Sequence, residues 1–363
     1  MRKTSASLAV FLCLATVGAA HRPEHHQEAS GGFTRVFPQT ANGTANGVVI
    51  RSGVTITNNT NREGSGSLRF FGDDGAPLTI NTSLGRGESF NFSLQAGEIL
   101  RLETDGQGPL QEGWTGVISD AELSGSLTFT MTRIDGSFLS EIAVGDSAPA
   151  GRQMIFAESR QGRYSAFAVC NPDAGADAHL SLELRGLKGM PLASKAVSLG
   201  PLAHRAEYVT ETLNEAGLRD FAGVLLVTSG LPVSLVTLRE SGSNYTSLPS
   251  VCDAVSVQTA RDIVFPRVAD GVFGDLRYRT AFLLLNNSDA PREATLEIFN
   301  LDGDVMPVTI GATSAARFRV NVPARGALEL ETDGRSDPGV AGWARVACEQ
   351  PLGGAGIPRG GRY

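Results

Sequence analysis

Apolar and polar residues alternate along several stretches of the chain with a period of two, which is typical of a β-strand. The clearest example is residues 123–132, where leucine, phenylalanine and methionine alternate with serine and threonine, and one glycine fills an apolar position. Residues 90–94 and 318–322 show the same alternation. Such strands place one face in a core and the other in water, so the sequence predicts an all-β protein.

Glycine and aspartate separate these stretches, at spacings of roughly 8–12 residues. Asp73-Asp74-Gly75 lies between two apolar runs and is typical of a hairpin turn, because glycine adopts the positive φ that other residues resist. Short strands joined by such turns predict antiparallel β-sandwiches.

A group of motifs occurs twice, 228 residues apart. The first copy reads VFPQTANG, TNNT, LRFFGDDG and LRLETDG, and the second reads VFPRVADG, LNNS, LEIFNLDG and LELETDG. Phe37 therefore corresponds to Phe265 and, after one inserted residue, Trp114 corresponds to Trp343. A match of this length indicates a duplicated folding unit. We predict that these four aromatic residues mark the core of the repeat.

A third, looser copy lies between the other two, so the sequence predicts three tandem sandwiches. Segments of small residues and proline at 143–151 and 253–261 would link them. The predicted organisation is a signal peptide at 1–20, a flexible leader at 21–32, and sandwiches at 33–142, 152–250 and 262–363. One helix is predicted in the middle sandwich, from Thr210 to about Leu218, because threonine suits an N-cap.

The last sandwich is predicted to be incomplete. After Cys348 the chain reads EQPLGGAGIPRGGRY, where the first copy has its long alternating strand. Glycine weakens a strand and proline removes a hydrogen-bond donor, so we expect the final strand or two to be missing. A neighbouring strand would then have an open edge. This edge would either self-associate with another chain or make the unit the least stable part, and the composition favours the second outcome.

The repeat resembles a known type of module. Its FP…G opening, its LNN or Asn-Pro strand end, its DG hairpin and its GW strand are similar to an Ig-like β-sandwich repeat of secreted bacterial proteins of uncharacterised function. The resemblance covers nearly all of the chain after the signal peptide. It implies export and an Ig-like modular architecture, and it supplies no catalytic residues.

The first twenty residues have the features of a secretory signal peptide. Arg2 and Lys3 precede an apolar run from Leu8 to Val17, and small residues follow at Ala19 and Ala20. No later run is long enough to span a bilayer. We therefore expect a secreted, periplasmic or cell-surface protein without a transmembrane segment.

Charge and cysteine content narrow the picture further. The net charge is −7 and basic residues form no stripe, so nucleic acid is not an expected partner. Cys170, Cys252 and Cys348 lie outside the signal peptide, and two of them can pair in an oxidising compartment. Cys170 and Cys252 bracket the middle unit and are the favoured pair. The two other pairings, and three unpaired thiols, remain open.

The sequence contains no recognisable catalytic motif. His179 and His204 are the only histidines inside the sandwiches, and there is no G-x-S-x-G, HExxH, CxxC or phosphate-binding Gly-Lys loop. The histidines of the leader lack further ligands at fixed spacing. We predict no enzyme activity, no catalytic residue, no cofactor and no metal.

Two repeated features have a second interpretation. Trp114 and Trp343 would suit sugar stacking, but their setting among glycine and apolar strand residues favours a core role. Asp105 and Asp333, in the repeated ETDG, would suit calcium together with the preceding glutamates. A Thr-Asp-Gly turn explains these residues more simply.

The sequence thus favours an exported, non-enzymatic structural or adhesive protein, with a surface protein or a polysaccharide as its unidentified partner. The alternative is a carbohydrate-binding accessory protein, which exposed co-planar aromatic rings would favour. Aromatic residues make up only 7% of the chain, and most alternate toward the core. A hydrolase with a scattered site is the third hypothesis.

Overall fold

The computed structural model describes residues 33–362, except 215–217, 219, 243, 249 and 253–259. The predicted signal peptide, the leader and most of the second linker lie outside this range. The described chain is all-β with one short helix, and its sheets are antiparallel, which confirms the predicted class. No helix in it is long and apolar enough to cross a membrane.

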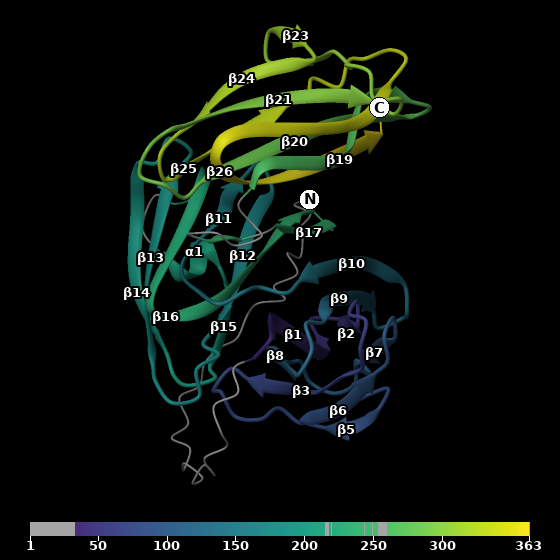
Figure 1. The fold of residues 1–363 in the computed structure, drawn as a ribbon, viewed down its shortest axis with the longest axis vertical. Coiled ribbons are helices and arrows are strands. Elements are labelled where there is room, and N and C mark those ends of the chain that lie inside the picture. Colours follow the sequence, from purple (N-terminus) through teal and green to yellow (C-terminus); the bar gives the residue numbers. More distant parts are fainter. Residues whose placement is uncertain are drawn as a thin grey trace, which may run out of the picture.

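Three consecutive parts of the chain each form one large sheet, and we name these parts units one, two and three (Figure 1). Unit one contains β1 (Arg35–Ala45), β2 (Val48–Thr57), β3 (Gly64–Gly72), β4 (Ile80–Thr82), β5 (Gly85–Gly87), β6 (Ser89–Leu94), β7 (Ile99–Glu103), β8 (Gln111–Ser119), β9 (Ser124–Arg133) and β10 (Phe138–Gly145). Unit two contains β11 (Ala150–Arg160), β12 (Arg163–Cys170), β13 (Ala178–Gly186), β14 (Pro191–Leu199), β15 (His204–Tyr208), α1 (Val209–Thr212), β16 (Phe221–Ser241), β17 (Asn244–Leu248) and β18 (Val251–Cys252). Unit three contains β19 (Ala260–Phe273), β20 (Leu276–Asn286), β21 (Arg292–Asn300), β22 (Val308–Ile310), β23 (Thr313–Ala315), β24 (Arg317–Val322), β25 (Gly326–Glu331) and β26 (Val340–Arg362).

Each large sheet has two halves that share a long strand. In unit one, β1 pairs with β8 along its first part and with β2 along its last residues. In unit two, β16 pairs with β11 and β13 and then with β12, and in unit three β26 pairs with β19 and β21 and then with β20. The two halves face each other, since apolar side chains from both fill one core per unit. Phe37 and Phe265 lie in the cores of units one and three.

The prediction that unit three lacks its final strand or two is wrong for the counterpart of β9, which is present. Residues 353–362 form the second part of β26 and pair with β20 along its length, as β9 pairs with β2 in unit one. β20 also pairs with β25 on its other side, so the open edge does not lie on β20 as expected. The outer edge of this part of β26 pairs with no strand among the described residues, whereas β9 is covered by β10.

Glycine is favoured at one position of this last strand because a phenylalanine ring lies close to the place of a side chain. A Cβ at Gly354 would lie 3.2 Å from the ring of Phe265, and a Cβ at Gly125 in β9 would lie 2.7 Å from the ring of Phe37. The two glycines occupy equivalent positions, opposite Leu284 and Ile56. Gly354, one of the glycines that argued against a strand, is therefore part of the repeat.

The predicted helix is shorter than expected, and its N-cap is Tyr208 instead of Thr210. Residues 215–217 of the predicted span lie outside the described residues. α1 covers only Val209–Thr212, and Leu213 leaves the helical conformation with φ −99° and ψ 48°. Val209 and Leu213 are both buried in the core of unit two. One helical turn is sufficient to place both side chains in this core.

The predicted disulfide is also wrong. Cys170, Cys252 and Cys348 are not disulfide-bonded. Cys170 lies on β12 against residues of unit one, whereas Cys252 lies on β18, which pairs with β11. The bracketing of unit two in sequence therefore does not bring the two thiols together.

Candidate functional site

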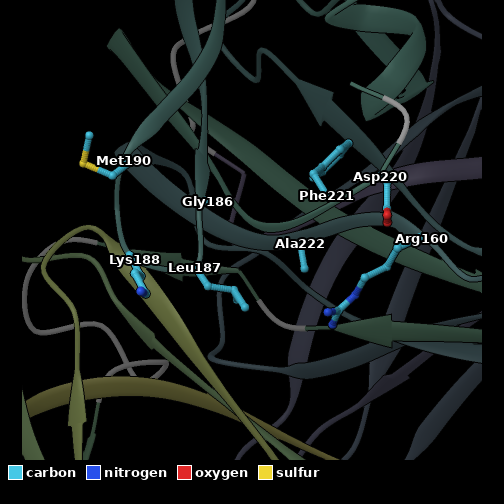
Figure 2. A pocket seen from close by; sticks show the side chains of 8 residues that line it. All are labelled: Arg160, Gly186, Leu187, Lys188, Met190, Asp220, Phe221 and Ala222. Atoms are coloured by element: carbon cyan, nitrogen blue, oxygen red, sulfur yellow. The ribbon is translucent and has the colours of Figure 1, made fainter. Parts of the chain in front are cut away.

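A groove of about 420 Å³ lies beside the β13–β14 turn and the start of β16 (Figure 2). Its charged lining residues are Arg160, Lys188 and Asp220. Arg160 binds Glu158 and Glu329, so its guanidinium is already neutralised by two carboxylates. None of the described lining residues is a serine, cysteine or histidine.

The residues considered for catalysis and metal binding have structural partners. His179 is exposed on β13, with Nδ1 2.9 Å from the hydroxyl of Ser198. His204 is buried, with Nδ1 2.7 Å from Oδ1 of Asp73. Asp105 accepts hydrogen bonds from the backbone of Gln107 and from two asparagine side chains, as a turn residue does. The described residues contain no group of three ligands suited to a metal.

The residues that the repeat singled out lie instead at the contacts between units. Trp114 is fully buried, but it belongs to a cluster with Val36, Phe71 and Cys170 that lies outside the core of unit one. Its indole stacks on Phe71, with ring centroids 4.6 Å apart, and its Nε1 donates a 2.7 Å hydrogen bond to the carbonyl of Leu202 in unit two. We call this contact the first joint.

The first joint has a defined backbone geometry. The turn at 72–76 of unit one, which we call an acceptor turn, receives the loop at 199–204 of unit two, which we call a docking loop. The N–H of His204 donates to the carbonyl of Asp73 at 3.1 Å. Gly75 has φ +81°, and a Cβ on it would lie 2.2 Å from the carbonyl oxygen of Pro201. Only glycine leaves room for this approach.

The contact between units two and three, the second joint, repeats this geometry. The acceptor turn is now 186–190 and the docking loop is 322–327. The N–H of Ala327 donates to the carbonyl of Leu187 at 3.0 Å, and a Cβ on Gly189 would lie 2.2 Å from the carbonyl oxygen of Ala324. Leu202 and Arg325 occupy the same loop position, and both have a positive φ. An apolar cluster that includes Met154, Val224 and Leu283 fills the rest of the second joint.

Unit three has the equivalent acceptor surface, and no docking loop among the described residues lies on it. Trp343 stacks on Phe299 with centroids 4.4 Å apart and an interplanar angle of 21°, the angle found for Trp114 and Phe71. Val264, the counterpart of the buried Val36, is 57% exposed. On or beside the acceptor turn at 300–304, Leu301 is 82% and Val305 68% exposed. We name the surface formed by Val264, Phe299, Leu301, Val305 and Trp343 the open acceptor face.

Sequence reasoning identified Trp114 and Trp343 but not the docking loops or the faces they bring together. A pattern that indicates these faces is present in the sequence. Residues 166–170 and 281–285 are apolar at every position, whereas residues 53–57 of unit one alternate. A strand that is apolar throughout is buried on both sides. Ala168 and Leu283 are indeed buried at the two joints.

A carboxyl group with a shifted pKa lies at the edge of the first joint. Burial raises the pKa of Glu112 to about 7, and the nearby carboxylate of Asp73 adds to this increase. Gln39 donates a hydrogen bond to Glu112 at 3.2 Å, which opposes it. Glu112 is therefore protonated in the folded protein at pH values where an exposed glutamate is ionised.

This shift predicts that stability falls as the pH rises. Between pH 4.5 and pH 7 the folded state holds more protons on Glu112 than the unfolded chain, so the free energy of unfolding decreases with pH. Each unit of pKa corresponds to ~1.4 kcal/mol, and the side chain is partly exposed, so we expect a loss of about 2 kcal/mol. Urea unfolding of the wild type and of Glu112→Gln tests this. The variant should match the wild type at pH 4.5 and be more stable at pH 8, and parallel profiles would contradict the prediction.

Comparison with known proteins gives no relative from which to transfer a role. No protein-family model and no curated protein matches the chain. A search of solved structures returns a chain from the atomic structure of Sulfolobus Turreted Icosahedral Virus, at 11% identity, covering 88% of this chain and 82% of that chain. The TM-score is 0.12, which is too low to support any argument about fold or function.

Proposed function

We propose that the protein is an exported, non-enzymatic structural or adhesive protein built from three tandem Ig-like β-sandwiches, as the repeat resemblance implies. The open acceptor face carries the proposal. On unit three it is the counterpart of the surface by which unit one contacts unit two. Three of its apolar residues, Val264, Leu301 and Val305, are more than half exposed. Exposed apolar groups that lie together on a folded protein mark interaction sites.

The described chain offers more to binding than to catalysis. In the groove beside the β13–β14 turn, Arg160 is paired with two carboxylates, and the buried His204 is held by Asp73 at the first joint. The repeated residues serve contact between units. This pattern is what a modular protein at the cell exterior needs.

Carbohydrate binding remains the second candidate, because the indole of Trp343 is partly exposed beside Phe299. An indole face suits the apolar face of a sugar ring. The two rings are stacked on each other, so only the outer face of the indole is available to a sugar.

A binding screen tests the proposal. The purified chain should bind a cell-envelope fraction, and Leu301→Asp should weaken that binding about tenfold, because it places a charge on the open acceptor face. Ile134→Asp is the matched control, since Ile134 is 70% exposed on unit one, away from this face. Binding to a soluble polysaccharide that is lost in Trp343→Ala would favour the carbohydrate function. Failure to bind any envelope fraction or polysaccharide would refute both.

A further inference from the structure

The two ends of the described chain carry the two halves of a joint. Unit three carries the open acceptor face. Unit one has a loop at 94–99 in the position of the docking loops 199–204 and 322–327, directly before β7, β15 and β25 respectively. Neither half is covered within the described residues, because a Cβ placed on Gly97 or on Gly303 would meet nothing within 4 Å.

The loop of unit one has the backbone of a docking loop. Asn58 donates its side-chain amide to the carbonyl of Leu94, as Asn171 does to Leu199 and Asn286 to Val322. The N–H of Glu98 donates to the carbonyl of Gln95 at 3.0 Å, and in unit two Ala203 donates to Gly200 at 3.1 Å.

The left-handed position of the loop is also conserved among the three units. Gly97 has φ +81°, Leu202 φ +56° and Arg325 φ +50°. The next strand begins two residues after the left-handed position, at Ile99 in unit one and at His204 in unit two. The loop is therefore folded as a docking loop before any partner arrives.

We propose that the open acceptor face binds the 94–99 loop of a second copy of this chain. The joints inside the chain fix the contacts. The N–H of Ile99 would donate to the carbonyl of Leu301, and the carbonyl of Gly97 would accept from Nε1 of Trp343, which donates no hydrogen bond to a residue that the structure describes. The carbonyl of Ala96 would lie over Gly303, as Pro201 lies over Gly75.

This contact joins two different surfaces, so each added copy leaves a new open face. Such a heterologous contact builds rows of molecules or closed rings. Ile99 is 61% exposed and would cover Val264 and Leu301. The inference rests on the structural role proposed above, because it names the partner of the same face.

The contact between copies is weaker than the joints inside the chain. Units two and three present alanine, cysteine and leucine on the strand face beside the docking loop, at Ala166, Ala168 and Cys170 in unit two. Unit one presents Gly53, Thr55 and Thr57 at these positions. A polar outer face is typical of a terminal repeat. Because it weakens the contact between copies, we expect assembly only at higher protein concentration.

The test uses one variant on each surface. Leu301→Asp blocks the acceptor face, and Ile99→Glu blocks the loop; both side chains are largely exposed, so the fold of each variant should be retained. In sedimentation velocity across a concentration series, the wild type should form species larger than a dimer. Each variant alone should associate at least about tenfold more weakly. Ile134→Glu, the matched control, should associate like the wild type.

A mixture of the two variants decides the geometry. Each variant keeps one working surface, so an equimolar mixture should form a dimer and stop there. If Leu301→Asp abolishes association while Ile99→Glu has no effect, unit three pairs with itself and the proposal is wrong. A wild type that stays monomeric throughout the series also refutes it. Binding of that monomer to an envelope fraction would leave the proposed function intact.

Discussion

Replacing Trp114 with alanine should lower the free energy of unfolding by about 3–5 kcal/mol, whereas the same change at Trp343 should cost only about 1 kcal/mol. Both indoles stack on a phenylalanine at the same angle, and both occupy the same position in the repeat. They differ because unit two covers Trp114 and accepts its N–H at Leu202, while Trp343 is partly exposed. The difference between the two variants therefore measures the first joint.

Urea unfolding at low protein concentration measures this difference without interference from association. The chain has only two tryptophans, so each variant also reports the environment of the remaining one. The fluorescence of Trp114 alone should be shifted to shorter wavelength than that of Trp343 alone. Equal losses of stability in the two variants would mean that unit two contributes nothing to the burial of Trp114.

The repeated motifs predicted local structure well because local chemistry determines it. The 228-residue offset carries Asn58 onto Asn286, and both side chains donate to the same pair of backbone positions. It also carries Gly75 onto Gly303, and both have a positive φ in the same turn. These residues act on atoms a few positions away, or across one strand pair, so identical sequence produces identical structure.

The environment of each unit could not be predicted from the same motifs. Val36 and Val264 are the same residue in the same strand position, yet one is 1% and the other 57% exposed. The difference arises from a loop of a neighbouring unit, which no motif of the unit itself encodes. This is why the tryptophans were predicted to be core residues, although Trp114 lies at a joint and Trp343 on the open acceptor face.

The final strand was missed because its glycines were judged as isolated residues. Next to a phenylalanine ring of the core, glycine fits better than a residue with a side chain. Gly125 occupies such a position in unit one, beside Phe37. Gly353 serves a second contact, since a Cβ there would lie 2.0 Å from the side chain of Val251 in unit two. A close approach of two elements makes glycine favourable in a strand that its composition argues against.

The buried charge cluster near the second joint gives the other large expected effect. Glu158 is fully buried on β11 and binds Arg239, which is only 4% exposed. Arg160 and Arg163 also bind Glu158, with nitrogen–oxygen distances of 3.0 and 3.4 Å. Arg160 continues the cluster to Glu329 of unit three, which Arg359 contacts at 3.2 Å.

Glu158→Ala should therefore lower the free energy of unfolding by about 3–5 kcal/mol, because it leaves buried guanidinium groups without their shared carboxylate. The double variant Glu158→Leu with Arg239→Leu should recover much of this loss, since apolar residues of similar size replace a buried ion pair at little cost. Glu297→Ala is the matched control on a strand of unit three. The side chain of Glu297 is 16% exposed, but its partner Arg317 is 70% exposed, so the guanidinium left behind is solvated by water and the loss should be about 0–1 kcal/mol. Urea unfolding of the three variants distinguishes these cases. If Glu158→Ala and Glu297→Ala lose the same stability, the cluster is not held together by Glu158, and the arginines have another counter-charge.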